Sequence, residues 1–168
     1  MNYIRIWDRI SDDRPYEYIA NSKFVSGRIK KYYRRDSHVI NPPIDLQKFR
    51  IGKSGDYFLM VGRLMAYKRF DIAVDAFNKH GWPLKIIGRG PEIKKLKKIA
   101  KSNIEFTGRL EDEELFETYA NAKAFVFPQE EDFGLVAIEA MASGRPIIAF
   151  RGGDIVEHAR EGKEAVYF

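Results

Sequence analysis

The fold is decided by residues 123–150, KAFVFPQEEDFGLVAIEAMASGRPIIAF, in which an acidic loop and an apolar helical stretch separate two apolar runs. The runs at 123–128 and 146–150 lack the alternation of half-exposed strands. Unbroken apolar runs are typical of parallel strands that are covered on both faces. Gly144 stands where the helix between them would end. The stretch therefore predicts a strand–helix–strand unit of an α/β fold.

The same alternation extends over most of the chain. Apolar runs that suit strands fall at 57–62, 83–88, 104–108, 123–128, 146–150 and 165–168. Stretches that suit helices lie between them, at 69–81, 91–101, 111–122, 134–144 and 154–162. The pattern predicts a Rossmann-like, doubly wound parallel sheet of six strands.

Local signals agree with these helices. Gly81 and Gly162 sit where a helix would close, and Pro91 suits a first helical turn. Four apolar residues of the first helix recur at helical spacing and should face the core: Phe70, Ala73, Val74 and Phe77.

Residues 1–50 follow a different pattern. We expect a strand at 16–22, a helix at 22–33 with Ser22 as its N-cap, and a second strand at 37–41 that Asn41-Pro42-Pro43 ends. An extended linker should follow over 42–49. One strand–helix–strand piece is too small to bury a core alone. We therefore interpret 1–50 as the remnant of an earlier domain and 51–168 as the main domain.

Composition excludes several classes of protein. The chain has 168 residues and no cysteine, so it has no disulfide and no thiolate metal site. No run approaches the length of a membrane span and the N-terminus does not resemble a secretory signal, so we expect a cytoplasmic protein.

The positive charge is concentrated at the N-terminal end. Residues 1–50 hold 11 Lys and Arg against 6 Asp and Glu, whereas residues 51–168 hold 18 of each. One interpretation is a solvated basic helix. Another is a surface that contacts anionic lipid at the inner membrane face, or an acidic partner. Nucleic-acid binding is not expected, because no recognised nucleic-acid-binding motif accompanies the basic residues. The basic residues of this helix are Arg28, Lys30, Lys31, Arg34 and Arg35.

The chemistry is densest where the acidic loop meets the apolar helix. Ligands of open α/β sheets bind at the carboxyl ends of strands, beside such loops. Free N–H groups of Phe133, Gly134 and Leu135, together with the helix dipole, would bind an anion. Gly134 would let a phosphate approach the backbone closely.

Two glutamates flank this helix start. Glu139 lies six residues beyond Phe133, about 9 Å along a helix, where its carboxylate would accept hydrogen bonds from ribose hydroxyls. Glu131 would lie on the sugar side of the phosphates. The structural alternative is that the acids supply favourable charge to the first turn and that Glu139 is an exposed helix residue. However, its apolar neighbours favour a buried carboxylate with a partner.

With these residues in view, the sequence is similar to a known family. EDFGLVAIEAMASGRPIIA resembles the E-x7-E signature of the retaining glycosyltransferases with the GT-B fold, the glycosyl transferases group 1. Val61-Gly62-Arg63-Leu64 with Lys68 and Arg69 resembles the family's first phosphate-contacting segment. The loops 88–91 and 106–110 resemble its base-side loops, and 19–22 and 42–45 the end of its N-terminal domain. The sequence EDFG at 131–134 resembles the corresponding segment of mannosyltransferases of polysaccharide assembly.

The resemblance implies roles for particular residues. Arg63 and Lys68 would neutralise the donor diphosphate and, with Glu131, form the catalytic set. Taken alone, the Arg63–Lys68 segment also fits a structural ion pair. Residues expected to bind the donor are Gly62, Gly88, Gly90, Arg109, Leu110, Phe133, Gly134, Leu135 and Glu139. The resemblance implies a nucleotide sugar as substrate, GDP-mannose above all, with no cofactor and no metal. His38, His80 and His158 lack ligand spacing.

The remaining expectations concern completeness. The family uses two Rossmann-like domains, and most of the first, together with the C-terminal helices of the second, is not found in this sequence. The expected acceptor is a glycan or a lipid-linked glycan. The isolated chain is expected to be inactive and either to self-associate or to need an N-terminal-domain partner. The alternative is a module that binds the nucleotide sugar without transferring it. A dinucleotide-dependent oxidoreductase is disfavoured, because residues 62–66 lack the glycine fingerprint.

Overall fold

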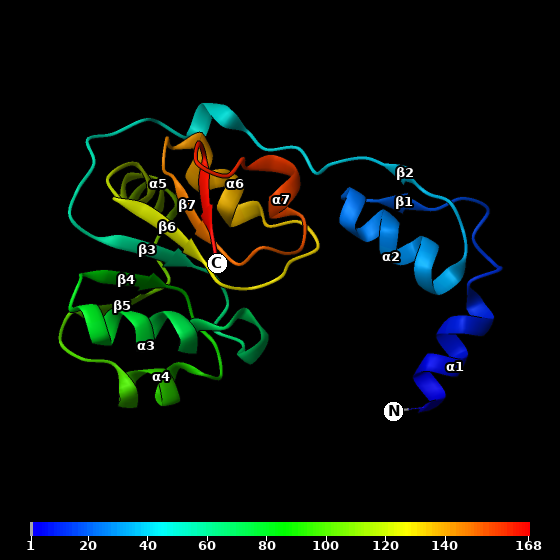
Figure 1. Cartoon of the computed structure of the whole chain (residues 1–168), viewed down its shortest axis with the longest axis horizontal. Helices are drawn as coiled ribbons and strands as arrows, with labels where there is room; N and C mark the ends of the chain where they lie inside the picture. Colours follow the sequence, from blue (N-terminus) through cyan, green and yellow to red (C-terminus); the bar gives the residue numbers. More distant parts are fainter. Residues whose placement is uncertain (1) are drawn as a thin grey trace. The chain divides into compact units, whose positions relative to one another are not determined.

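The computed structural model describes residues 2–168, which fall into two compact units, residues 2–43 and residues 44–168 (Figure 1). The division lies before the 50/51 position that the charge distribution suggested. Phe49 packs on Phe116 and Tyr119 of the second unit, with ring centroids 5.0 and 6.3 Å apart. The expected extended linker contains a turn of 3₁₀ helix, η1 (Leu46–Lys48), capped by the Asp45 side chain. These contacts assign the segment after Pro43 to the second unit.

The first unit contains the expected strand–helix–strand piece. Strand β1 (Ile19–Ala20) pairs in parallel with β2 (His38–Val39), and α2 (Lys23–Tyr33) connects them. Ser22 caps α2 as predicted, because its side-chain oxygen accepts the Val25 N–H at 3.1 Å. Both strands are shorter than predicted. A further helix, α1 (Asn2–Ser11), precedes them and was not predicted.

The second unit is a parallel sheet in the order β5-β4-β3-β6-β7-β8. All six predicted strands are confirmed, each within two residues of its expected bounds. They are β3 (Phe58–Val61), β4 (Leu84–Ile87), β5 (Ile104–Gly108), β6 (Ala124–Phe127), β7 (Ile147–Ala149) and β8 (Ala165–Tyr167). The order is that of a doubly wound Rossmann-like sheet, in which the chain leaves a central pair of strands in opposite directions.

Helices cover both faces of this sheet (Figure 1). The helices are α3 (Phe70–His80), α4 (Ile93–Ile99), α5 (Asp112–Ala120), α6 (Leu135–Ala142) and α7 (Ile155–His158), and η2 (Ala66–Lys68) is a turn of 3₁₀ helix. All four core residues predicted on α3 are buried. Gly81 closes α3 in the left-handed conformation, as expected. Pro91 lies before α4 rather than in its first turn, and Gly162 lies beyond α7, in the turn that leads to β8.

The strands build two cores because successive side chains point to opposite faces. Phe58 and Met60 of β3 join the core beneath α3 and α4. Leu59, between them, joins the core beneath α5, α6 and α7. This explains the unbroken apolar runs, since both faces of each central strand are covered.

Candidate functional site

The candidate site lies at the carboxyl ends of β3 and β6. These two strands are neighbours, but the chain proceeds from β3 toward β4 and from β6 toward β7, on opposite sides. The loops after them therefore diverge. In open α/β sheets ligands usually bind between two such loops, a position called the β3–β6 crevice below. The loop after β3 begins at Gly62 and the loop after β6 at Pro128.

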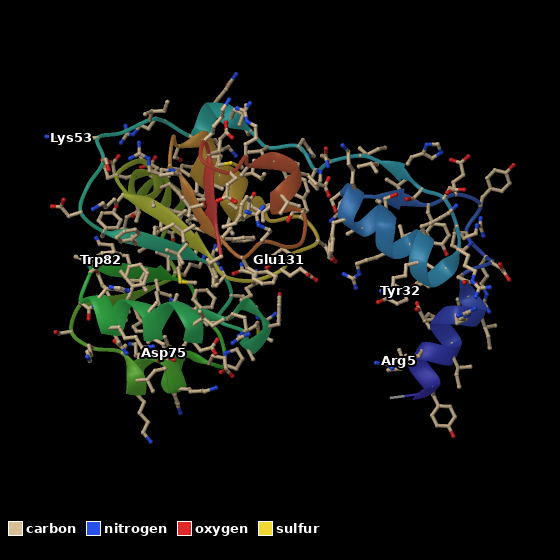
Figure 2. The ribbon with its side chains drawn as sticks, viewed as in Figure 1. Arg5, Tyr32, Lys53, Asp75, Trp82 and Glu131 are labelled. Atoms are coloured by element: carbon tan, nitrogen blue, oxygen red, sulfur yellow. The ribbon has the colours of Figure 1, made fainter. Side chains whose placement is uncertain are left out.

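An ion pair joins these two loops. Lys68 Nζ lies 2.5 Å from Glu131 Oε1, and their side chains are 14% and 19% exposed. Glu131 lies on the loop after β6 and is marked in Figure 2. The amide nitrogen of Gln129, a buried residue, lies 3.5 Å from the same carboxylate oxygen. The structure thus brings together two of the three residues expected to be catalytic.

The third of these residues, Arg63, has a different environment. It lies on the same loop as Lys68 and its side chain is exposed. Within residues 2–168, the structure gives its guanidinium no hydrogen bond or ion pair. Its charge is therefore uncompensated, whereas that of Lys68 is matched by Glu131.

Backbone packing explains the glycines of these loops. A Cβ on Gly88 would lie 1.9 Å from the carbonyl oxygen of Gly62, and one on Gly90 would lie 2.4 Å from that of Leu64. Gly62 and Gly88 also adopt φ values of 154° and 137°, which other residues rarely adopt. The loops after β3 and β4 thus touch backbone to backbone. This contact requires glycine at positions 88 and 90, two of those expected to bind the donor, independently of any ligand.

The start of α6 differs from the expectation of free amides. The N–H of Gly134 donates to Asp154 Oδ2 at 2.9 Å, and that of Leu135 donates to the carbonyl of Phe133 at 2.9 Å. The prediction that both amides are free is therefore wrong for this structure. A buried carboxylate from the loop after β7 already occupies the helix start. Gly134 also has a packing role, since a Cβ there would lie 2.6 Å from the Phe127 ring.

Glu139 has the partner that its apolar surroundings suggested. The hydroxyl of Tyr119, a fully buried residue of α5, donates to Glu139 Oε2 at 2.9 Å. Burial raises the pKa of Glu139, and the Tyr119 hydrogen bond opposes this rise. The pKa of Tyr119 is raised well above its usual value, mainly by burial. Glu139 is half-buried rather than exposed, and no local signal in the sequence indicated Tyr119 as its partner.

Arg109 and Leu110 follow β5, the edge strand of the sheet, which β4 separates from β3. Arg109 is exposed, whereas Leu110 packs against the core beneath α5, α6 and α7. Phe133 lies beside the ion-paired loop, with its ring edge-on to His158 at 5.4 Å. The candidate residues therefore form a group at the β3–β6 crevice and a second group on the β5 side.

An apolar cavity of about 280 Å³ lies elsewhere, beside α3. Its lining includes Phe58, Phe77, Trp82, Pro128 and Phe168, but neither Lys68 nor Glu131. An apolar cavity without charged residues does not suit a diphosphate.

Residues 2–168 contain no group of three or more His, Cys, Asp or Glu side chains arranged to hold a metal ion. Within the same range, each helix is too short or too polar to cross a bilayer.

The fold and the crevice place the second unit in the Rossmann-like class of α/β domains. The sequence profile of the family Glycosyl transferases group 1 matches residues 43–168, and the chain belongs to this family. The match begins at the boundary of the second compact unit.

Individual relatives agree with this family. The sulfoquinovosyl transferase SQD2 of Arabidopsis thaliana is 35% identical over 144 residues, which are 79% of this chain and 28% of that protein. A GDP-mannose-dependent alpha-mannosyltransferase of Corynebacterium glutamicum is 40% identical over 103 residues, 61% of this chain and 25% of that protein. The chain therefore spans about a quarter of the length of these curated relatives.

Solved structures show the same fold. The crystal structure of Anabaena HepE in complex with UDP and glucose superposes with a TM-score of 0.80 at 19% sequence identity. The match covers 90% of this chain and 49% of HepE. The six-stranded sheet is thus that of a GT-B glycosyltransferase domain.

Proposed function

We propose that this chain binds a nucleoside-diphosphate sugar, GDP-mannose above all, for retaining transfer of the sugar to a glycan or lipid-linked acceptor. The Lys68–Glu131 pair at the β3–β6 crevice is the observation that carries the proposal. Partly buried ion pairs add little net stability, because desolvation offsets their attraction. A pair held at the ligand-binding edge of the sheet is therefore better explained by ligand binding than by stability.

In this proposal the diphosphate binds to Lys68 and Arg63. The bond between the sugar and the diphosphate breaks during transfer, and negative charge collects on the departing phosphate. Two cations on one loop, of which Lys68 is held by Glu131, stabilise that charge, so a metal ion is not needed. Glu131 orients the Lys68 ammonium and faces the sugar. Because Asp154 occupies the Gly134 amide, the side chains rather than the start of α6 contribute most to phosphate binding.

Glu139 is proposed to bind the ribose of the donor. Its Oε2 accepts from Tyr119, which leaves the rest of the carboxylate for the ribose hydroxyls. The glycine loops after β3 and β4 and the Arg109–Leu110 segment are proposed to face the phosphates and the base. A mannosyl donor is supported by the similarity to a relative named for GDP-mannose.

A thermal-shift panel tests the proposal. The full chain is melted with GDP-mannose, UDP-glucose and UDP-N-acetylglucosamine, each beside its free nucleoside diphosphate. We expect the largest rise in melting temperature with GDP-mannose, because a ligand that binds only the folded state stabilises it. No rise with any nucleotide sugar at millimolar concentration would contradict the proposed function. A larger rise with a UDP-sugar would support the proposed binding site but contradict GDP-mannose as the donor.

A second candidate is a module that binds the nucleotide sugar but transfers nothing alone. It is favoured by the position of the expected site residues, all of which lie in the second compact unit, between Gly62 and Glu139. Retaining transfer needs donor and acceptor held together and shielded from water. Addition of a separately produced N-terminal domain from a family member distinguishes the two. Transfer that appears only with the added domain supports the module, whereas transfer by the chain alone refutes it.

Contact with an anionic membrane surface is proposed for the basic helix α2 and the residues after it. Arg28, Lys31 and Arg34 are exposed there. However, Lys30 pairs with Asp36 at 2.6 Å, and Arg35 donates to the Asp12 carbonyl at 3.3 Å. Arg28 and Lys31 lie over the rings of Phe24 and Tyr32, 5.8 and 5.3 Å from the ring centroids. Sedimentation with phosphatidylserine vesicles, against neutral vesicles as control, tests whether this surface binds lipid.

A further inference from the structure

Asp154 is a buried carboxylate to which the proposed function assigns no direct contact with the donor. It lies just before α7, in the loop after β7, and is 0% exposed. Its Oδ2 accepts the Gly134 N–H at 2.9 Å and lies 3.7 Å from Nε2 of His158. Within residues 2–168, its Oδ1 has no hydrogen-bond partner. A carboxylate in this position is costly, because it is removed from water with only part of its hydrogen-bonding capacity used.

The main chain of Asp154 makes a second contact with the same loop. Its N–H donates to the carbonyl of Glu131 at 3.1 Å. The adjacent Gly153 has φ of 74°, and a Cβ there would lie 2.7 Å from the same carbonyl oxygen. Glycine therefore lets the loop after β7 lie directly against the loop after β6.

These two contacts hold both ends of a short segment. The carbonyl of Glu131 and the N–H of Gly134 are fixed by one residue, with only Asp132 and Phe133 between them. Fixing the backbone on both sides limits the directions that the Glu131 side chain can take. That side chain is the one that reaches Lys68 across the crevice.

The acceptor of the Gly134 amide comes from a different loop. Gly134 is the N-cap residue of α6 and has no side chain, so it cannot supply a capping oxygen to the first turn of the helix. The Asp154 carboxylate instead accepts the N–H of the N-cap residue itself, from the loop after β7. The contact therefore couples two loops as well as satisfying one amide.

We propose that Asp154 is a positioning residue that holds the Glu131–Gly134 segment, so that Glu131 stays against Lys68 and faces the donor sugar. The inference deepens the proposed function and rests on it for the effect on the donor. The effect on loop order is independent of any ligand. A test therefore needs one measurement with donor and one without.

The variants are Asp154→Ala, which removes the acceptor, and Asp154→Asn, which keeps a carbonyl oxygen for the Gly134 amide. Asp75→Ala, at an exposed position of α3, is the matched control (Figure 2). If Asp154→Ala does not fold, Asp154→Val removes the same acceptor while keeping a side chain of similar size. All are measured in the full chain.

The measurement without ligand is hydrogen–deuterium exchange of residues 129–135. Loss of the acceptor should speed exchange of the Gly134 amide by about tenfold, the scale of one charged hydrogen bond. Asp154→Asn and the control should stay close to the unmodified chain. Unchanged exchange in Asp154→Ala would overturn the inference.

The measurement with ligand compares affinity for GDP-mannose with affinity for GDP by calorimetry. Asp154→Ala should weaken the affinity for GDP-mannose by about tenfold and the affinity for GDP much less. Asp154→Asn should bind GDP-mannose nearly as tightly as the unmodified chain. An equal loss for both ligands, or no loss, would overturn the positioning role. If the unmodified chain binds neither ligand nor any UDP-sugar, the proposed function fails, while the exchange experiment still decides whether Asp154 orders the loop.

Discussion

The hydroxyl of Tyr119 in α5 donates a 2.9 Å hydrogen bond to the carboxylate of Glu139 in α6, and Tyr119 is fully buried. The pair joins two helices on the same face of the sheet. It gives Glu139 a structural partner in addition to its proposed ligand. Two roles of Glu139 can be separated by experiment. Its effect on folding stability depends on its ionisation and therefore on pH, whereas its proposed role in ribose binding is measured as affinity for the donor.

Glu139→Gln should not destabilise the chain at neutral pH. Burial raises the pKa of Glu139 in the folded state. A raised carboxyl pKa favours folding below the unfolded pKa, and this contribution is lost as pH rises through the folded pKa. Ionised Glu139 therefore costs stability at pH 7, and glutamine removes that cost while still accepting from Tyr119. We expect a melting temperature at or above that of the unmodified chain at pH 7, and convergence of the two near pH 4.

Tyr119→Phe is the matched control for this experiment. It removes the Tyr119–Glu139 hydrogen bond, which Glu139→Gln keeps, and leaves the carboxylate, so it should lower stability at pH 7 by about 1–2 kcal/mol. A Glu139→Gln variant that is as unstable as Tyr119→Phe at pH 7 would contradict the assignment of the cost to ionisation.

Glu139→Gln should weaken donor binding by roughly 1–3 kcal/mol, the scale of lost hydrogen bonds to a charged group. Calorimetry with GDP-mannose measures this. If the affinity is unchanged while the melting temperature collapses, Glu139 is structural and the ribose assignment fails.

Binding of a nucleoside diphosphate should not require a divalent metal. Calorimetry with GDP should give the same affinity with and without EDTA, because Arg63 and Lys68 supply the positive charge. Lys68→Met should weaken binding by about tenfold. The control is Lys85→Met, which breaks a Lys–Glu pair between β4 and β5, where Lys85 Nζ lies 3.7 Å from Glu105 Oε2. Binding that disappears with chelator would contradict the metal-free proposal.

Gly88→Ala should be strongly destabilising. The added Cβ would lie 1.9 Å from the Gly62 carbonyl oxygen, and φ is 137°, so the two loops must separate. We expect a loss of roughly 3 kcal/mol or more in urea unfolding. Gly81→Ala is the control, since φ is 71° and the added Cβ would meet nothing within 4 Å. It should cost only about 1 kcal/mol. If Gly88→Ala and Gly81→Ala lose equal stability, the positive φ angle rather than the contact between the loops explains the loss.

The chain should self-associate through α1. The helix has one apolar side, because large side chains recur three and four residues apart. They are Tyr3, Ile6, Trp7 and Ile10, which are 55–88% exposed. Ile6→Glu with Trp7→Glu should shift the chain toward a monomer in sedimentation velocity. Arg5→Glu, on the polar side of the same helix, should not. A monodisperse monomer of the unmodified chain at micromolar concentration would refute the prediction.

Much of the fold could be predicted from residue order alone. Residues 57–168 carry apolar periodicities that are local properties, and these gave all six strands and the positions of the helices between them. The Ser22 cap is equally local, since its partner, Val25, is three residues away. Helix α1 was not predicted, although its apolar residues recur at helical spacing.

The tertiary structure decided how the candidate residues are paired. Lys68 and Glu131 are 63 residues apart, and Gly134 and Asp154 are 20 apart. The sequence indicated Lys68, Glu131 and the helix start, but not that Glu131 would hold Lys68 or that a second carboxylate would occupy the Gly134 amide. Parallel strands bring distant loops to one edge of the sheet, and the side-chain contacts made there leave no periodicity in the chain. Periodicity therefore determined the elements, and the order of strands in the sheet determined which of their loops meet.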